Sequence, residues 1–208
     1  MRIEVPGTGR PVARRLRGAA VACLLLAVVV VVGSWNGLLL IVARHVIPGW
    51  VVGNTLIVAT LLLMLVGAMW RRGEPSSGRR PDLRTAVRRP TSWLLVLSTV
   101  IAVLGNTLGA ADDLISGAAY HVLEPSGPGG CRAVVRETSF LFAGGGDVYA
   151  VGPSGLGRRT SSWSSDDGYR PIASSTYELR WGAENANLSV NGSDVDPVWP
   201  ALHEIDCR

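Results

Sequence analysis

The chain has 208 residues and a formal net charge of +4, and 48% of its residues are hydrophobic although only 6% are aromatic. Such an apolar excess argues against an ordinary soluble domain. All 20 basic residues are arginine, and their clusters flank long apolar runs instead of lining a polar face, which argues against a nucleic-acid-binding protein.

The N-terminal part combines a basic tail with a long uncharged run. Residues 1–17 hold five arginines, and the next 26 residues, 18–43, carry no charge. About 20 apolar residues cross the hydrocarbon core of a bilayer, so residues 18–43 are predicted to form the first transmembrane helix. The run is too long for the apolar region of a cleaved signal peptide, which has about 7 to 15 residues.

Two more apolar runs, 51–70 and 92–111, are predicted to form the second and third transmembrane helices. The connection 44–50 is short, whereas the linker 71–91 holds seven arginines. By the positive-inside rule the basic tail and the linker 71–91 lie in the cytoplasm. This orientation predicts that the loop 44–50 and all residues after 111 lie outside the cell membrane.

Two of the three cysteines, Cys131 and Cys207, bracket the last third of the chain. Outside the cytoplasm disulfides form and persist, so we predict a bridge between them. By the chain-entropy model, closing a loop of about 77 residues stabilises a domain by roughly 4 to 5 kcal/mol. A metal pair is the alternative, but His203 is the one nearby imidazole and no C-x-x-C motif is present. Cys23 falls within the first predicted helix and is left unpaired.

The segment 131–208 changes to an alternating pattern of β-branched, aromatic and polar residues. The predicted strands cover 132–143, 147–151, 176–181 and 187–191. The predicted turns cover 144–146, 152–157, 166–171 and 182–186. Residues 198–206 are predicted to form a short helical turn from which Trp199 packs onto the sheet.

The fold class expected from these patterns is membrane α plus small β. Three transmembrane helices are followed by a disulfide-closed, mainly antiparallel β-domain outside the cytoplasm, over residues 131–208. Residues 112–130 are expected to form a juxtamembrane segment and a flexible hinge, because their second half is rich in glycine and proline.

Three asparagines stand beside glycine in the predicted helices, Asn36, Asn54 and Asn106. All three fall in the outer part of their helices, so their side chains are predicted to meet as an intramembrane polar cluster. Asparagine side chains form hydrogen bonds between membrane helices, which makes the cluster a device for holding the bundle together. A polar binding or conduction site is the alternative interpretation.

Charged residues are also predicted at the outer ends of two helices. Arg44 ends the first helix, and Asp112 and Asp113 end the third. We expect an ion pair across this outer rim. An ion pair exposed to water stabilises a protein by less than about 1 kcal/mol.

No enzymatic activity, cofactor or metal site is predicted. Ser154, His203 and Asp206 are the residue types of an acyl-transfer triad, but no G-x-S-x-G motif is present. Potential metal ligands also lack the spacing of known metal sites.

The sequence resembles multi-pass membrane proteins of high-GC actinobacteria that carry a small C-terminal outer domain. The resemblance rests on the arginine-only basic content, the three apolar runs and the tail DDGYRP...YELRW...VWPALHEIDC. It implies no particular activity. The leading hypothesis is a non-enzymatic protein of the cell membrane, held in the lipid bilayer, whose β-domain binds an envelope protein or a ligand outside. The alternative is an accessory subunit of a transporter or another membrane complex, assembled through the three helices.

Overall fold

The computed structural model describes residues 9–72, 90–193 and 195–207. The chain forms two compact units, each of them discontinuous in sequence. The helical unit contains Met1–Val32 and Trp50–Asn106, and the β unit contains Gly33–Gly49 and Thr107–Arg208. Part of the predicted basic tail 1–17 and most of the predicted linker 71–91 lie outside the described residues.

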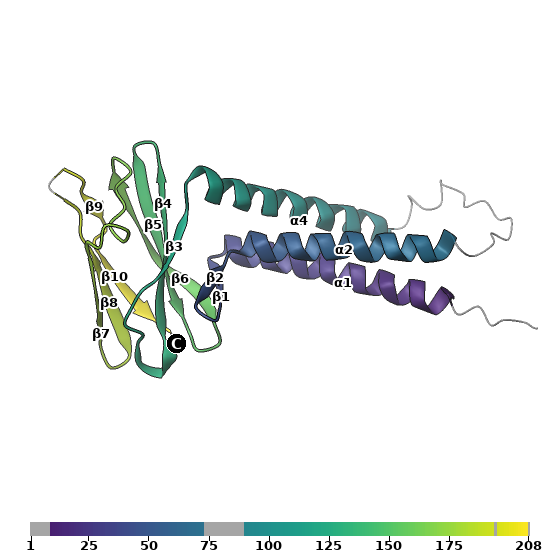
Figure 1. The fold of residues 1–208 in the computed structure, drawn as a ribbon, viewed down its shortest axis with the longest axis horizontal. Helices are drawn as coiled ribbons and strands as arrows, with labels where there is room; N and C mark the ends of the chain where they lie inside the picture. The colour runs from purple at the N-terminus through teal and green to yellow at the C-terminus, as the bar shows by residue number, and fades with distance from the viewer. Residues whose placement is uncertain (1–8, 73–89, 194, 208) are drawn as a thin grey trace, which may run out of the picture. The chain divides into compact units, whose positions relative to one another are not determined.

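Three long helices, α1 (Gly9–Trp35), α2 (Gly49–Arg72) and α4 (Pro90–Ile115), supply the helical unit (Figure 1). Within the described residues, three segments are long and apolar enough to cross a membrane: Val12–Trp35, Gly49–Trp70 and Trp93–Ile115. Most of their large apolar side chains are exposed, which suits a lipid environment and not water. The sequence prediction of three such helices is confirmed.

Small residues let the helices of this unit approach one another. The buried residues Leu24, Ala27 and Ala102 form its core. Gly105 of α4 faces Val31 of α1 so closely that a Cβ atom on Gly105 would lie 2.3 Å from Val31 Cγ1. Close approach through small residues is the usual packing mode of membrane helices.

Helix α1 ends at Trp35, earlier than the predicted span 18–43. Asn36 and Gly37 form a turn, and the φ of +79° at Gly37 is one that glycine adopts without strain. Strand β1 (Leu38–Val42) follows and pairs with β2 (His45–Ile47) in a hairpin, which replaces most of the predicted loop 44–50. Branched apolar residues such as those of β1 suit a buried strand as well as a helix.

The β unit contains two antiparallel sheets. The larger sheet has the order β2-β1-β6-β5-β4-β3, with β9 also paired to β6, and the smaller has the order β10-β8-β7. The remaining strands are β3 (Ala119–Val122), β4 (Arg132–Phe140), β5 (Ala143–Val151), β6 (Leu156–Asp166), β7 (Tyr177–Trp181), β8 (Asn185–Val190), β9 (Val198–Trp199) and β10 (Leu202–Asp206). Strand β1 pairs with β6, so the segment between the first two helices is part of the same domain as the C-terminal segment.

The main core lies between the two sheets and includes Val135, Val148, Trp163, Leu188 and Ile205. A second core covers the other face of the larger sheet and consists of Leu39, Ile41, Val134, Tyr149 and Val151.

Residues from both edges of the larger sheet reach this second core. Val46 of β2 and Tyr120 and Val122 of β3 all pack against it. Beyond these edge strands, Arg44 forms an ion pair with Glu124. The larger sheet therefore curls around the second core.

The structure confirms an antiparallel β-domain and corrects several details of it. The predicted hinge region 112–130 contains β3, which pairs with β4. The predicted turn 144–146 lies inside β5, because Gly146 leaves the space that the ring of Trp163 fills. The predicted helical turn over 198–206 is wrong: this segment forms β9 and β10, and Trp199 is 79% exposed.

Candidate functional site

The predicted disulfide between Cys131 and Cys207 is present, with its Cα atoms 5.9 Å apart. Cys131 directly precedes β4 of the larger sheet, and Cys207 directly follows β10 of the smaller sheet. The bridge therefore ties the two sheets together at one end of the domain. Cys23 is a free cysteine, as predicted.

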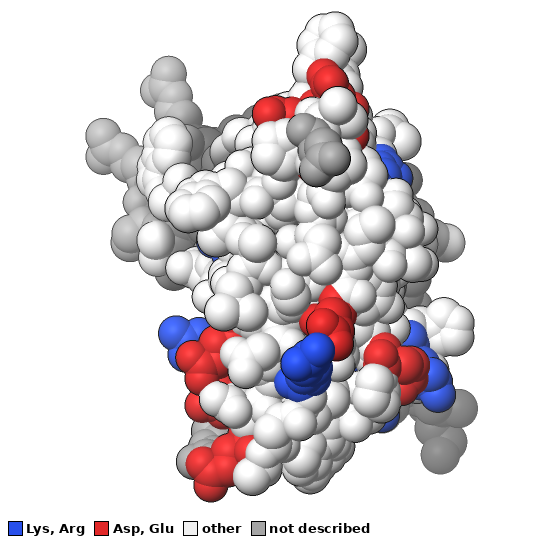
Figure 2. Space-filling model, turned by 90° about the vertical axis from the view of Figure 1, so that its left-hand side faces the viewer, with Lys and Arg blue, Asp and Glu red and all other residues white. Residues whose placement is uncertain are grey.

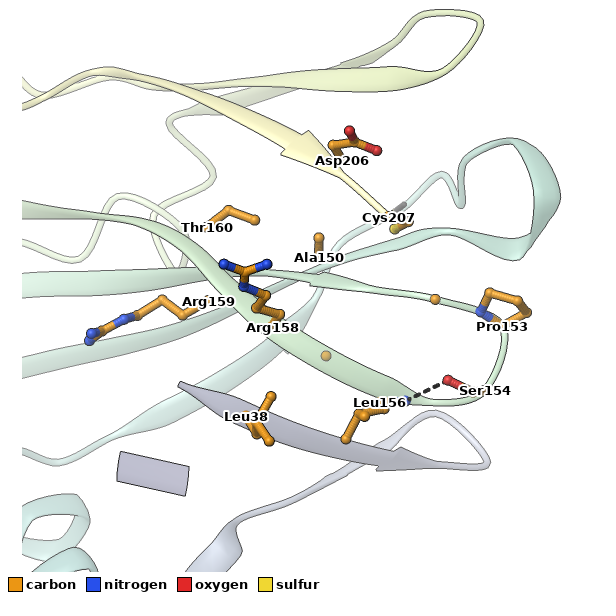
Figure 3. Close-up of a pocket in the computed structure, with 12 residues that line it drawn as sticks. Leu38, Ala150, Pro153, Ser154, Leu156, Arg158, Arg159, Thr160, Asp206 and Cys207 are labelled. Carbon is orange, nitrogen blue, oxygen red and sulfur yellow. Dashed lines mark hydrogen bonds between the residues drawn. The ribbon is translucent and has the colours of Figure 1, made fainter. Parts of the chain in front are cut away.

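A cavity of about 660 Å³ lies beside this bridge, and we call it the β6 hollow (Figure 3). Its walls come from β1, the end of β5, the β5–β6 turn, β6 and the end of β10. The lining residues are Leu38, Ala150, Gly152, Pro153, Ser154, Leu156, Gly157, Arg158, Arg159, Thr160, Asp206 and Cys207. Its volume is within the range of about 300 to 1,000 Å³ that is common for ligand sites.

The two arginines of the β6 hollow differ in what they contact. The Arg159 side chain points away from Asp206 in Figure 3 and forms an ion pair with Asp147 at 3.2 Å. Arg158 is exposed, and in the part of the chain that the structure describes it has no carboxylate within ion-pair distance. Its guanidinium group is therefore available to an acidic group of a ligand.

The rest of the hollow combines hydroxyl groups with apolar walls. The Ser154 hydroxyl accepts a hydrogen bond from the backbone N–H of Leu156 at 3.3 Å, and the Thr160 hydroxyl donates one to the carbonyl of Val148. Leu38 and Leu156 line the hollow with exposed apolar side chains. A cation beside apolar surface can bind a ligand, but these groups supply no activated nucleophile.

Of the side chains considered for an acyl-transfer triad, Ser154 and Asp206 line the β6 hollow, but His203 does not. His203 is buried in the core, where its Nδ1 lies 2.9 Å from Ser161 Oγ and its ring packs against Trp163. Burial lowers the pKa of His203, and the backbone carbonyl of Pro200 partly opposes this shift. Asp206 is exposed on the opposite face of β10 from His203. In the described ranges, no three His, Cys, Asp or Glu side chains are grouped as metal ligands.

The predicted ion pair between Arg44 and the end of the third helix does not form. Arg44 pairs with Glu124, whereas Asp112 and Asp113 pair with Arg136 of β4. The Nη2 and Nε atoms of Arg136 donate to Asp113 Oδ1 at 2.7 and 2.9 Å. Sequence reasoning missed Arg136, because only the pairing of β3 with β4 brings it to the end of α4.

This charge cluster of Arg136, Asp112 and Asp113 is extended by Asp147 and two tyrosines. Tyr120 donates its hydroxyl hydrogen to Asp113 Oδ2 at 3.0 Å. Burial, and next the charge of Asp113, raises the pKa of Tyr120, and burial together with Asp147 raises the pKa of Tyr149 to about 12. Burial alone would lower the pKa of Arg136, but its bonds to Asp113 outweigh this effect and raise it. The cluster therefore keeps a charged arginine and neutral tyrosines, and it fastens the end of α4 to the larger sheet.

The three predicted intramembrane asparagines occupy different settings. Asn36 lies in the turn after α1, within the β unit, and Asn54 is exposed on α2. Asn106 is buried and donates to the carbonyl of Ala102 at 2.7 Å. Gly53 leaves room for it, since a Cβ atom there would lie 2.0 Å from Asn106 Oδ1. Of the three, only Asn106 contributes a buried side chain to the helical unit.

The side of the molecule that carries the smaller sheet is drawn in Figure 2. Acidic and basic side chains lie next to one another on it, and uncharged residues cover most of its area. On β7, Glu178 and Arg180 form an ion pair at 2.7 Å. This face therefore has no large area of a single charge sign that would attract a charged partner. Arg158 in the β6 hollow is the more specific feature for binding.

Comparison of the chain with protein-family models, curated proteins and solved structures finds no match. The assignment of a function therefore rests on the chemistry of the two units.

Proposed function

We propose that the chain is a non-enzymatic integral membrane protein whose β unit lies outside the cell membrane and binds a partner or ligand in the β6 hollow. The three helices that are long and apolar enough to span a bilayer support the membrane part of this proposal. The observation that carries the binding part is the hollow itself, which strands of both sheets, β1 among them, build beside the disulfide.

The pairing of β1 with β6 supports the proposed sidedness. Segments that share one sheet must lie on one side of a membrane, so the β1–β2 hairpin accompanies the C-terminal strands. Among the described residues, the helices α2 and α4 lie between these segments in sequence, and two crossings return a chain to the side it left. The arginine-rich stretches 1–17 and 71–91 then share the other side, which the positive-inside rule makes cytoplasmic. An oxidised Cys131–Cys207 pair is consistent with a β unit outside the cytoplasm.

The lining of the β6 hollow indicates the chemistry of the partner. Arg158 offers a planar pair of donors for a carboxylate or phosphate group. Leu38 and Leu156 offer apolar contact at the same site. We therefore expect a ligand that carries an acidic group beside an apolar group, such as the end of an envelope polypeptide.

The test uses the full chain, because residues 117–208 alone lack β1 and with it part of the second core. A photo-crosslinking amino acid replaces Leu156, which is 53% exposed in the wall of the hollow. We expect one discrete adduct in cells, and we expect Arg158→Glu to abolish it. Arg180→Glu is the matched control, since Arg180 is an exposed arginine of the smaller sheet that does not line the hollow.

An adduct that survives Arg158→Glu, or its absence from the start, contradicts binding in the hollow. If crosslinkers at exposed helix positions such as Leu62 capture discrete membrane subunits instead, the accessory-subunit alternative gains support.

A further inference from the structure

The hairpin between β4 and β5 ends in three consecutive large apolar residues, Phe140, Leu141 and Phe142, which we call the FLF tip. Their side chains are 50%, 74% and 79% exposed, and none of them belongs to either core of the β unit. Connections of this kind are normally polar, and neighbouring apolar side chains left in water usually mark a contact surface. The tip therefore requires an occupant.

A backbone hydrogen bond fixes the base of the FLF tip beside the end of α4, which from Thr107 onward belongs to the β unit. The N–H of Ser139 donates to the carbonyl of Ser116 at 2.8 Å. Nearby, Arg170 Nη2 donates to the carbonyl of Gly117 at 2.7 Å. Ser116 directly follows the last residue of α4, so the base of the FLF tip lies at the point where the apolar segment Trp93–Ile115 ends.

The last residues of α4 are also apolar and exposed. Leu114 and Ile115 are 83% and 61% exposed, and both belong to the apolar segment that is long enough to span a bilayer. No charged residue occurs between positions 138 and 146, so the hairpin end itself carries nothing that resists apolar surroundings. We therefore expect the FLF tip and the end of α4 to be covered by the same surroundings.

We propose that the FLF tip lies in the interfacial layer of the same bilayer that α4 spans, so that lipid holds the β unit at a second point. This inference rests on the proposed membrane-spanning role of the helices. Aromatic and aliphatic side chains partition favourably into this layer without crossing the membrane. Asp166 pairs with Ala143, and together with Asp167 it flanks the tip, so these carboxylates stay at the level of the lipid head groups and limit the depth of insertion.

Spin-label accessibility in lipid nanodiscs tests the proposal. Single cysteines replace Phe142 or, in a second variant, Leu141, in a full-length Cys23→Ala background where the disulfide stays intact. The discs contain phosphatidylethanolamine and phosphatidylglycerol. Relaxation of each label by oxygen, which concentrates in lipid, is compared with relaxation by a water-soluble nickel chelate.

Two further positions serve as references. Ser154→Cys lies in the turn at the other end of β5 and reports water, and Leu62→Cys lies at an exposed position within α2 and reports lipid. We expect the ratio of oxygen to nickel accessibility at positions 141 and 142 to exceed that at position 154 and to approach that at position 62.

Failure of the lipid contact at the FLF tip and failure of the membrane-spanning premise give different results. If position 62 is lipid-exposed while positions 141 and 142 match position 154, the FLF tip lies in water and the inference is wrong. If position 62 itself is water-exposed, the membrane-spanning premise fails. If labels at position 142 show dipolar broadening by one another, a second copy of the chain covers the tip, and this also overturns the inference.

Discussion

Replacing Ile41 by alanine tests whether the segment after α1 belongs to the β unit or continues a membrane helix. Ile41 is 5% exposed in the second core, whereas its neighbour Val42 is 51% exposed. Ile41→Ala removes three carbon atoms, and at about 0.8 kcal/mol for each buried carbon the loss is about 2.4 kcal/mol. The cavity left behind adds to this, so we expect a total of about 3 kcal/mol. Val42→Ala is the matched control and should cost less than about 1 kcal/mol, because half of its side chain already contacts solvent.

Hydrogen exchange of the full-length protein in detergent micelles measures this difference. For Ile41→Ala we expect the amides of β5 and β6 to exchange about 100-fold faster, since about 1.4 kcal/mol corresponds to a factor of ten. The amides of α2 should keep their rates, because their hydrogen bonds lie within the helix. If Ile41→Ala and Val42→Ala have equal and small effects on β5 and β6, residues 38–42 do not contribute to the β unit and the observed pairing is refuted.

Three further predictions concern the helical unit and the charge cluster. Gly53→Ala should destabilise the helices by about 1 to 3 kcal/mol in a thermal melt, because its Cβ atom would clash with Asn106; at Gly67 an added Cβ atom would make only ordinary contacts, so Gly67→Ala should not destabilise them. Arg136→Leu should destabilise the β unit by about 1 to 3 kcal/mol in chemical denaturation, since it takes the arginine away from the half-buried carboxylate of Asp113; a loss below about 1 kcal/mol would contradict the proposed role of the cluster. Tyr149 keeps its proton up to a pKa of about 12 in the folded state but only to about 10 when unfolded, so stability should fall between pH 10 and 12, and Tyr149→Phe should flatten this decrease.

The runs of apolar residues and the number of cysteines were sufficient to predict the three apolar helices and the disulfide. A run of 20 or more uncharged, mostly apolar residues has few alternatives to a membrane-spanning helix. The pairing of Cys131 with Cys207 follows from the small number of cysteines once Cys23 is assigned to a helix. Both predictions depend on local sequence and on counting, not on the three-dimensional contacts of particular side chains.

The end of α1 was harder to predict, because the strand partner of β1 is far away in sequence. Residues 38–40 pair with residues of β6 that follow more than a hundred positions later. The Asn36–Gly37 dipeptide is the local signal for the turn, since this pair is typical of tight turns. The apolar residues on both sides of this pair obscured that signal.

The candidate site was predicted least well, for a similar reason. Strand β6 was not predicted because serine and arginine dominate it, and yet it lines the hollow. Glycines 144–146 suggested a turn, but the bulky ring of Trp163 on β6 requires a residue without a side chain at Gly146. Arg136 likewise acquires its partners only after β3 and β4 pair. Contacts between distant strands decide each of these features.

Labelling of single cysteines in intact cells is the most direct test of the central claim, that the β unit lies outside a membrane which the helices span. Ser154→Cys in the β5–β6 turn and Ser77→Cys in the arginine-rich stretch 71–91, each in the Cys23→Ala background, react with a maleimide that does not cross membranes. We expect position 154 to be labelled in intact cells and position 77 to be labelled only after the cells are permeabilised. Labelling of position 77 but not of position 154 in intact cells would contradict this claim.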